Sequence, residues 1–343
     1  MSGVGAGLAR PPDPLRDHAA QQRWVDERLV EHGLQRTGPY DRVHRRPWAT
    51  AARVPTDAGT LWFKAHTPVL AREAPVTRVL AGLRPEVVLD VVDSDDDRCW
   101  LLTRDAGAKL RVQVTGPEEL DLLVPVLQAY ADLQRAAVPE AEALLTAGAL
   151  DRRSTRVAEL LAEALDAPSL GEGMPYGLGP SERARLAGLV PRLAEVAASG
   201  SVVPDTLEHS DLHDGNVFAP EDDPGDFRIA DLGDCCVGHP FVSLVVLDRS
   251  LVARLRVAPD GPELARLHRA YLEPWTDVAP YAELERLAAA VRPLGLLGRG
   301  LTWRALVAGV DDPGMAEFAD GWPEYARELA DALDPVRPGA APP

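Results

Sequence analysis

The residues with the clearest chemical potential lie in the stretch 209–234, which is rich in His, Asp and Gly. Asp211 is followed five residues later by Asn216, and Asp231 stands just after the short apolar run 229–230. Phosphoryl transfer requires such groups, because one carboxylate must accept the proton of an attacking hydroxyl and other oxygen ligands must hold Mg²⁺. We therefore predict Asp211 as a catalytic base, and Asn216 and Asp231 as magnesium ligands.

Phosphoryl transfer also needs a cation that holds the nucleotide phosphates. Lys64 lies near the end of an apolar stretch at 61–65, and Glu73 opens the helix predicted at about 72–83. A strand lysine fixed by a helix glutamate meets this need, because an ammonium is a compact charge that reaches phosphate oxygens. Only two of the 36 basic residues are lysines, Lys64 and Lys109, so a lysine here is informative. We predict that Lys64 is catalytic and binds the nucleotide, with Glu73 holding it in place.

The N-terminal third of the chain has to supply the sheet that carries Lys64. A helix is predicted over 15–34 from its apolar stripe, and short β-like segments follow it. A turn at 55–59 joins two of these segments into a hairpin. The predicted strands are 48–54, 61–65, 87–92 and 98–103. We expect an N-terminal nucleotide-binding lobe over residues 1–103.

The remainder of the chain has a mainly helical pattern, punctuated by Pro and Gly. The predicted helices are 117–136, 151–165, 181–199, 243–256, 261–273, 281–296 and 315–333. The stretch 202–241 interrupts them with the predicted catalytic residues and a short strand at 227–230. We expect residues 104–334 to form a C-terminal catalytic and substrate-binding lobe, and the tail 335–343 to be disordered.

Taken together and in this order, the motifs resemble the aminoglycoside phosphotransferase and choline kinase family of small-molecule kinases. The resemblance covers about residues 45–250 and is most specific at 62–65, 209–217 and 229–240. It implies an α+β fold of the bilobal protein-kinase-like type, with a small antiparallel-sheet N-lobe and a larger, mainly helical C-lobe. It also implies ATP and Mg²⁺ as cofactors, although the sequence does not distinguish ATP from GTP.

The same resemblance assigns the hinge between the lobes. Leu102, Thr103 and Arg104 would bind the adenine through their backbone groups. The chain departs from the family pattern in two places. It has no Gly-x-Gly-x-x-Gly loop, and it reads Gly-His-Pro at 238–240 where the family commonly has Gly-Asp-Pro.

Composition limits the partners that this chain can have. Asp and Glu outnumber Lys and Arg by 53 to 36, giving a net charge of −17, whereas nucleic-acid backbones are bound by clustered Lys and Arg. The chain has three cysteines, two of them adjacent, and shows neither a signal peptide nor an apolar run that could span a membrane. We expect a cytoplasmic protein that binds neither nucleic acid nor membrane. Nothing in the sequence specifies its oligomeric state.

The predicted function is ATP-dependent, Mg²⁺-assisted transfer of a phosphoryl group to a hydroxyl of a small molecule. No Ala-Pro-Glu activation segment follows Asp231, which argues against a protein acceptor. The Arg-, Ala- and Pro-rich composition is typical of a high-GC bacterial gene. With the resemblance, it favours an aminoglycoside or nucleoside-type antibiotic as the acceptor, and hence a resistance role. A metabolic acceptor such as choline, homoserine or a sugar is the alternative.

Two further interpretations stay open. A nucleotide-binding pseudokinase would share these motifs without turnover. A zinc hydrolase would use the alternating His209, Asp211 and His213 as ligands, which requires the three side chains to converge on one point.

Overall fold

The computed structural model describes residues 15–166 and 177–334, and the tail predicted to be disordered lies outside them. The N-terminal part is built around a five-stranded antiparallel sheet in the order β1-β2-β3-β5-β4. Its strands are β1 (Asp41–Arg46), β2 (Ala49–Thr56), β3 (Gly59–His66), β4 (Val91–Asp95) and β5 (Trp100–Arg104). Strand β1 is an addition to the predicted set, because its exposed sequence DRVHRR lacks the apolar alternation that indicates a strand.

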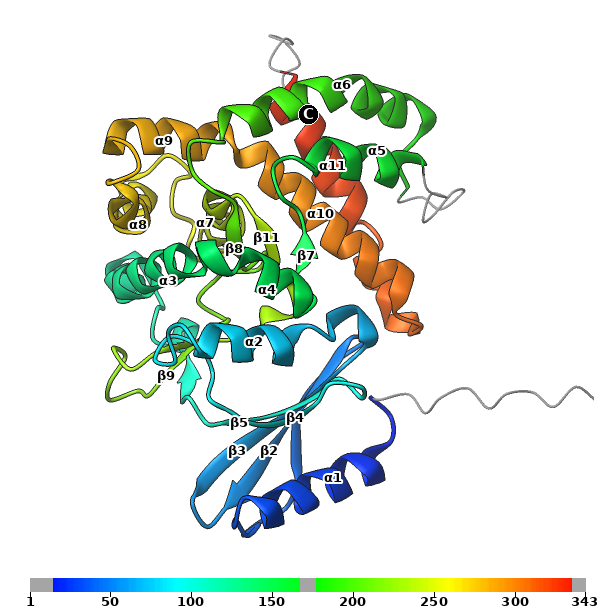
Figure 1. Ribbon diagram of the computed structural model, residues 1–343, viewed down its shortest axis with the longest axis vertical. Helices are drawn as coiled ribbons and strands as arrows, with labels where there is room; N and C mark the ends of the chain where they lie inside the picture. Colours follow the sequence, from blue (N-terminus) through cyan, green and yellow to red (C-terminus); the bar gives the residue numbers. More distant parts are fainter. Residues whose placement is uncertain (1–14, 167–176, 335–343) are drawn as a thin grey trace, which may run out of the picture.

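Alternation along β3 decides the direction of Lys64. Leu61 and Phe63 are buried in a core that they share with α1 (His18–Glu31) on one face of the sheet. Lys64 is adjacent to Phe63 in sequence, so its side chain is directed to the opposite face, where α2 (Glu73–Ala81) lies. Figure 1 shows the sheet between these two helices, with α2 toward the rest of the molecule.

The remaining described residues are mainly helical and surround a large apolar core. The helices are α3 (Leu123–Ala137), α4 (Ala141–Thr146), α5 (Val157–Asp166), α6 (Pro180–Ser199), α7 (Ser243–Leu255), α8 (Pro262–Leu272), α9 (Tyr281–Ala290), α10 (Arg292–Gly309) and α11 (Gly321–Leu333). Helix α10 packs against α5, α6 and α11 and descends toward the sheet (Figure 1). None of the described helices is long and apolar enough to cross a membrane.

The helix predicted at 281–296 is two helices, α9 and α10. Glycines inside α10 weaken the helical signal in the sequence. Two of these glycines are needed for close packing. A Cβ atom at Gly295 would lie 2.7 Å from Val245, and one at Gly300 would lie 2.9 Å from Trp322. The structure therefore trades helix propensity for contact between helices at these positions.

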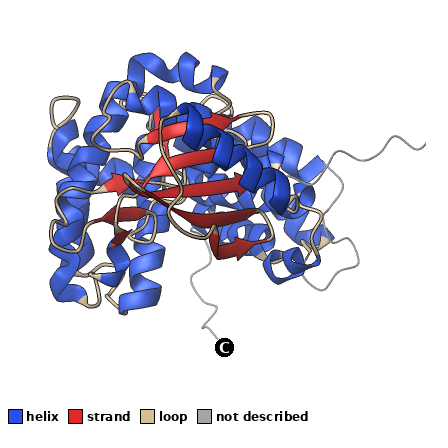
Figure 2. Cartoon of the chain, turned by 90° about the horizontal axis from the view of Figure 1, so that it is seen from below, coloured by secondary structure: helices blue, strands red, loops and turns tan. Residues whose placement is uncertain are grey.

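Two short three-stranded sheets hold the loops that carry the predicted catalytic residues. In Figure 2, which views the molecule from below, the strands lie at the centre with helices around them. One has the order β10-β9-β6, and the other the order β7-β11-β8. Their strands are β6 (Ala108–Lys109), β7 (Leu150–Asp151), β8 (Thr206–Glu208), β9 (Val217–Ala219), β10 (Arg228–Ile229) and β11 (Cys236–Gly238). Because β8 and β9 belong to different sheets, the loop 209–216 connects the two.

The predicted fold class is confirmed: the structure combines a small antiparallel sheet with a larger, mainly helical part. Several boundaries differ from the prediction. The strand predicted at 87–92 overlaps β4 only at 91–92, and the helix predicted at 315–333 starts at Gly321. The helix predicted at 151–165 starts only at Val157. The residues before Val157 include β7, whose two-residue length carries no periodic signal.

Candidate active site

Lys64 joins elements that are far apart in the sequence. Its Nζ donates to the two carboxylate oxygens of Glu73 on α2 at 2.9 Å and 2.8 Å, and to Oδ1 of Asp231 at 2.6 Å. Asp231 follows β10 and has a left-handed backbone conformation with a φ of 66°. His66 Nε2 lies 2.6 Å from the Oε2 atom of Glu73. We call Lys64, Glu73 and Asp231 the lysine cluster.

The charges of the lysine cluster stabilise one another. Burial by itself raises the pKa of Asp231, but the Lys64 ammonium outweighs burial and holds this pKa well below its usual range. Burial also opposes ionisation of Glu73, and Lys64 with His66 again makes the net pKa shift downward. Burial lowers the pKa of Lys64, whereas Asp231 and Glu73 together raise it above the ordinary value. All three groups are therefore charged at neutral pH.

The loop 209–216 places Asp211 and Asn216 beside each other. Asn216 Nδ2 donates to the backbone oxygen of Asp211 at 2.9 Å. His209 is fully buried, and its Nε2 lies 2.9 Å from the backbone oxygen of Ala230. Since Ala230 directly precedes Asp231, the imidazole of His209 links the loop 209–216 to the lysine cluster.

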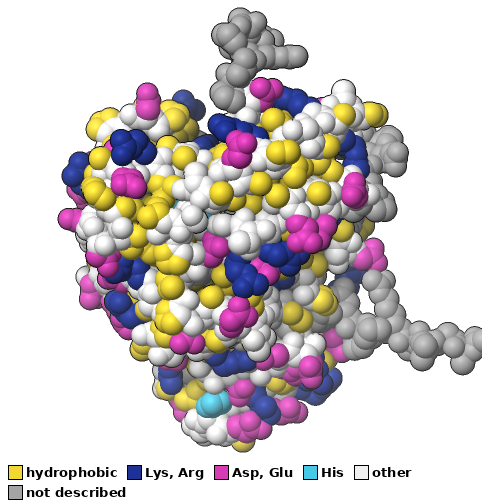
Figure 3. Space-filling view, turned by 45° about the horizontal axis from the view of Figure 1, so that its top comes forward, with side chains coloured by type: hydrophobic (Ala, Val, Ile, Leu, Met, Phe, Trp, Pro, Cys, Tyr) yellow, Lys and Arg dark blue, Asp and Glu magenta, His cyan; other side chains and the backbone are white. Residues whose placement is uncertain are grey.

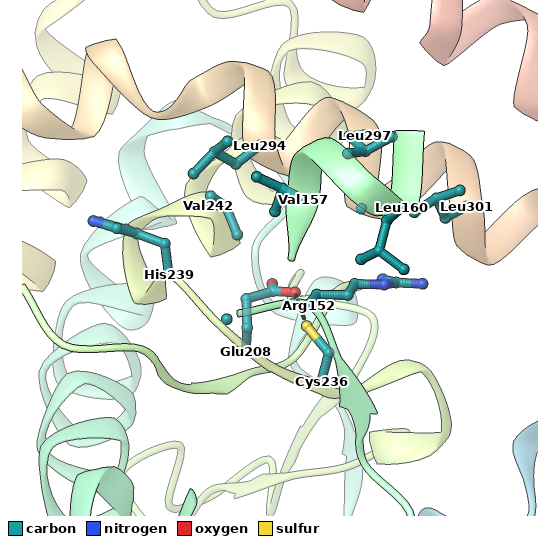
Figure 4. Close-up of a pocket in the computed structure, with 12 residues that line it drawn as sticks. Arg152, Val157, Leu160, Glu208, Cys236, His239, Val242, Leu294, Leu297 and Leu301 are labelled. Atoms are coloured by element: carbon teal, nitrogen blue, oxygen red, sulfur yellow. Dashed lines mark hydrogen bonds between the residues drawn. The ribbon is translucent and has the colours of Figure 1, made fainter. Parts of the chain in front are cut away.

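A buried carboxylate supports the backbone next to Asp211. Ser210 has a φ of 64°, a conformation that is costly for a residue with a side chain. Glu208 accepts hydrogen bonds from the backbone N–H of Ser210 at 2.7 Å, the hydroxyl of Ser243 at 3.2 Å and the thiol of Cys236 at 3.4 Å. Figure 4 shows Glu208 and Cys236 at a cavity of about 20 Å³, which has room for one water molecule. The buried carboxylate of Glu208 therefore stabilises the backbone conformation at the start of the loop 209–216.

Asp211 shares a guanidinium group with Asp234. Arg299 on α10 is 8% exposed, with Nη2 at 3.0 Å from Asp211 Oδ1 and Nη1 at 2.8 Å from Asp234 Oδ2. The same guanidinium lies 5.0 Å from the ring centroid of Trp303, in a cation–π contact. We call Arg299, Asp211 and Asp234 the arginine cluster. The sequence analysis did not identify Arg299.

The arginine cluster gives Asp211 a pKa of about 6. Burial is the main cause of this upward shift; Arg299 lowers the pKa, and the carboxylates of Asp234 and Asp231 raise it again. The carboxyl is therefore mostly ionised at neutral pH. Its pKa near the working pH suits a group that accepts a proton during a reaction.

A cavity of about 380 Å³ adjoins the lysine cluster, a size typical of small-molecule sites. Both lysines of the chain, Lys64 and Lys109, line it together with Asn216 and Asp231. Its apolar wall comes from the sheet and from β9, and includes Ala51, Leu89, Leu101 and Phe218. We name it the nucleotide cavity after the nucleotide-binding role that the sequence predicts for Lys64, which lines it.

The residues predicted for the hinge lie at the end of a strand. Leu102, Thr103 and Arg104 lie within β5, and their backbone pairs with β3 and with β4 or the residues just before it. The side chains of Thr103 and Arg104 line the nucleotide cavity, whereas Leu102 is buried in the core shared with α1. Ala106 lies beyond the strand and also lines the cavity. The backbone of Leu102–Arg104 is therefore engaged in the sheet, whereas Ala106 is a lining residue that follows the strand.

The oxygen donors at the nucleotide cavity fit Mg²⁺. The Asp231 side chain is 46% exposed, and its Oδ1 is held by Lys64. The amide nitrogen of Asn216 is used by Asp211, which leaves the amide oxygen as a donor to a cation. Magnesium commonly takes only one or two protein ligands beside phosphate oxygens and water. Asn216 and Asp231 supply that number.

The geometry does not favour a zinc site on the alternating histidines. His213 Nε2 lies 3.9 Å from Asp211, and His213 Nδ1 accepts from the backbone N–H of Gly215 at 3.0 Å, while His209 is bound to Ala230. Burial and the nearby guanidinium of Arg111 lower the pKa of His213 to about 3. Within residues 15–166 and 177–334, no group of three or more His, Cys, Asp or Glu side chains is arranged to hold a metal ion.

Comparisons with known proteins bear on the fold. No protein-family model and no curated protein sequence matches the chain. Among solved structures, a Plasmodium vivax ethanolamine kinase matches with a TM-score of 0.59 and 13% identity, covering 92% of this chain and 86% of that chain. A macrolide 2′-phosphotransferase type I matches with a TM-score of 0.56 and 15% identity over 88% of this chain and 96% of that one.

A third match carries bound molecules. It is a thermostable mutant of the aminoglycoside phosphotransferase APH(4)-Ia, described as a ternary complex with ADP and hygromycin B. The TM-score is 0.55 at 15% identity, and the match covers 93% of this chain and 99% of that one. At these identities, the similarity establishes a shared fold. The predicted α+β fold is thereby confirmed as one shared with these phosphotransferases and kinases.

Proposed function

We propose that this protein transfers the γ-phosphoryl group of ATP to a hydroxyl group of a small molecule. The observation that carries the proposal is the lysine cluster, in which Lys64 Nζ lies 2.6 Å from Asp231 and 2.8 Å from Glu73 at the edge of the nucleotide cavity. These groups come from segments far apart in the sequence, and phosphoryl transfer needs such a combination of cation and carboxylates. The shared fold with phosphotransferases and kinases supports the same function.

Each residue of the lysine cluster has a separate task in this proposal. Lys64 donates to the nucleotide phosphates, and Glu73 keeps the ammonium in place when the phosphates arrive. Asn216 and Asp231 hold Mg²⁺, which when bound neutralises charge on the phosphate oxygens. The backbone near Ala106 and the apolar wall of the cavity receive the base of the nucleotide.

Asp211 acts on the acceptor. The acceptor hydroxyl donates a hydrogen bond to the Asp211 carboxylate, which orients the hydroxyl oxygen toward the γ-phosphorus. A bond forms between that oxygen and phosphorus as the bond to the β–γ bridging oxygen breaks. The hydroxyl proton passes to Asp211, and ADP leaves with the bridging oxygen. A carboxyl with a pKa of about 6 can accept this proton and release it to water afterwards.

Arg299 is a positioning residue in this scheme. It binds Asp211 Oδ1 at 3.0 Å. The second oxygen, Oδ2, accepts a longer hydrogen bond of 3.4 Å from Asn216 Nδ2 and is the oxygen that would receive the acceptor hydroxyl. Asp234 and the face of Trp303 hold the guanidinium from two other sides. A carboxylate fixed in this way keeps its reacting oxygen in one place, and misplacement of about 1 Å can cost a hundredfold in rate.

For the acceptor, we propose an antibiotic with free hydroxyl groups, of the aminoglycoside or nucleoside type, so that the reaction confers resistance. Two of the structures that share the fold are named for antibiotic phosphorylation, and one of them holds hygromycin B. The alternative is a metabolic amino-alcohol or sugar, which the match to an ethanolamine kinase supports.

The test is a screen of hydroxylated antibiotics and metabolites with ATP and Mg²⁺. Each product is analysed by mass spectrometry for the gain of one phosphate group. We expect one chemical class to be phosphorylated by the wild-type protein and not by Asp211→Asn, which keeps the size of the side chain but removes the base. A protein that neither binds nor consumes ATP with any acceptor would refute the proposal. ATP binding without transfer to any compound would favour the pseudokinase instead.

A further inference from the structure

A second, larger cavity lies on the other side of β1 from the nucleotide cavity. Its volume is about 1340 Å³, and it is bounded by the start of α1, the turn between β1 and β2, the turn before β5 and the C-terminal end of α10. Strand β1 is a shared wall. Val43 and His44 line the nucleotide cavity, whereas Arg42 and Arg45 line the second cavity.

The second cavity is separate from the catalytic groups. Gly309, at the end of α10, lines it, and Arg299 of the arginine cluster lies ten residues earlier on the same helix. At a rise of about 1.5 Å per residue, the two positions are about 15 Å apart along the helix axis. No described residue lines both cavities, and none of the residues that line this one belongs to the lysine cluster or the arginine cluster.

Positive charge is concentrated in this cavity, although the net charge of the protein is −17. On the face of the molecule shown in Figure 3, acidic and basic side chains are interspersed. The cavity differs, because six arginines line it: Arg16, Arg23, Arg42, Arg45, Arg46 and Arg98. We call it the arginine cavity.

Carboxylates neutralise only part of this charge. Asp17, Asp97, Asp311 and Asp312 also line the cavity. Of these, Asp312 lies 3.4 Å from Arg16, and Asp17 accepts a hydrogen bond from the backbone N–H of Ala20 at 3.0 Å. Arg98 forms an ion pair at 3.2 Å with Asp95, a residue that does not line the cavity.

Three of the guanidinium groups have no carboxylate partner. Among the described residues, no ion pair involves Arg23, Arg45 or Arg46. Arg42 Nη1 lies 2.8 Å from Nε2 of His18. Arg42, Arg45 and Arg46 lie on the exposed six-residue strand β1, where their like charges repel one another. A bound anion would remove that repulsion.

We propose that the arginine cavity binds a compact polyanion whose charge lies on phosphate or carboxylate oxygens. Guanidinium groups present planar forks of donors that match these oxygens in pairs, and bonds between charged partners are the strong ones. The cavity also has apolar lining residues, among them Leu15, Pro47 and Val310, so the arginines account for the charge of the ligand and not for its whole shape. Since β1 separates the two cavities, the bound polyanion would also stabilise the wall of the nucleotide cavity.

The test measures anion binding to the full chain by calorimetry, with inorganic tripolyphosphate in one arm and citrate in the other. The protein carries Lys64→Ala, so that the nucleotide cavity lacks its central cation, and the buffer contains no magnesium, which tripolyphosphate would chelate. The cavity variant adds Arg23→Gln and Arg45→Gln. The matched control adds Arg286→Gln and Arg292→Gln instead, which remove the same charge from exposed positions on α9 and at the opposite end of α10.

We expect at least one of the two anions to bind, with an affinity about tenfold or more weaker in the cavity variant and unchanged in the control. Preference for tripolyphosphate would identify a phosphate ligand, and preference for citrate a carboxylate ligand. If neither anion binds, or if both variants weaken binding equally, the proposal is wrong. The outcome does not depend on ATP turnover, so it is independent of the proposed phosphotransferase function.

Discussion

Two clusters of the same composition, each with one cation between two carboxylates, behave differently in this molecule. In the lysine cluster, Lys64 Nζ lies within 2.9 Å of both Glu73 and Asp231, and the pKa of Asp231 is lowered. In the arginine cluster, Arg299 binds Asp211 and Asp234 at 3.0 Å and 2.8 Å, yet the pKa of Asp211 rises to about 6.

The difference follows from burial and from the further charges that surround each cluster. In the lysine cluster, the positive charge of Lys64 outweighs burial and lowers the pKa of Glu73, because His66 adds further positive charge beside that carboxylate. Arg299 is outweighed, because burial and the added negative charges of Asp234 and Asp231 act together on Asp211. In the proposed function, the ionised carboxylate of Asp231 would hold a cation, whereas Asp211, with a pKa of about 6, would take up a proton. The following predictions test that division of labour.

The largest effect is expected at the base. Asp211→Asn removes the proton acceptor and keeps the contact to Arg299 sterically possible, so kcat should fall by about 10³-fold. Nucleotide affinity should change less than twofold, since Asp211 does not line the nucleotide cavity. Steady-state kinetics and calorimetric titration of ADP measure the two quantities. Near-normal kcat would remove Asp211 from its role.

A smaller loss is expected at the cation of the lysine cluster. Lys64→Met keeps the length of the side chain but leaves Glu73 and Asp231 without their shared partner. We expect kcat/KM for the nucleotide to fall by about 10²-fold, as when one charged donor to a reacting group is removed. Thermal unfolding provides the control. A large loss of stability with unchanged kinetics of the folded fraction would show that the ion pair is only structural.

The arginine cluster should respond in kcat alone. Arg299→Lys keeps the positive charge but loses the fork that binds Asp211 and Asp234 together, so we expect about a tenfold lower kcat with an unchanged KM for the nucleotide. This split distinguishes positioning of the base from a general effect on the fold. An equal loss in both constants would contradict the separation of the two clusters.

The smallest effect is the pH dependence of the wild type. Asp211 must be ionised to accept a proton, and its pKa in the folded protein is about 6. Turnover should therefore be half-maximal near pH 6 and fall about tenfold per pH unit below it. The carboxylates of the lysine cluster have lowered pKa values and do not titrate in that range. The measurement is kcat against pH at saturating substrates. Asp211 titrates between about pH 5 and pH 7, so a flat profile over that range would contradict the assignment.

Much of the fold and all members of the lysine cluster could be predicted from the sequence, because each has a local signal. Lys64 stands in an alternating apolar strand, Glu73 opens an amphipathic helix, and Asp231 follows a short apolar run. Spacing along the chain was enough to suggest that they meet. Their meeting itself depends on the pairing of β3 and the docking of α2.

Arg299 could not be predicted in the same way. It lies between glycines in α10, whose pattern gives a weak helical signal, and its partners are about ninety residues or fewer away along the chain. Only the packing of α10 against the catalytic loop brings the guanidinium to Asp211. The hinge assignment of Leu102–Arg104 stays a prediction; these residues lie in β5, which ends at Arg104, one residue beyond the predicted strand.

The most direct test of the account is calorimetric titration of a non-hydrolysable ATP analogue into the wild type and into Asp231→Asn, each with and without Mg²⁺. The account predicts that the wild type binds the analogue more tightly when Mg²⁺ is present. Asp231→Asn should lose that enhancement, because it retains the size of the side chain but not its charge. Equal binding by both proteins under all conditions, or no binding by the wild type, would contradict the claim that the lysine cluster surrounds the phosphates of a nucleotide.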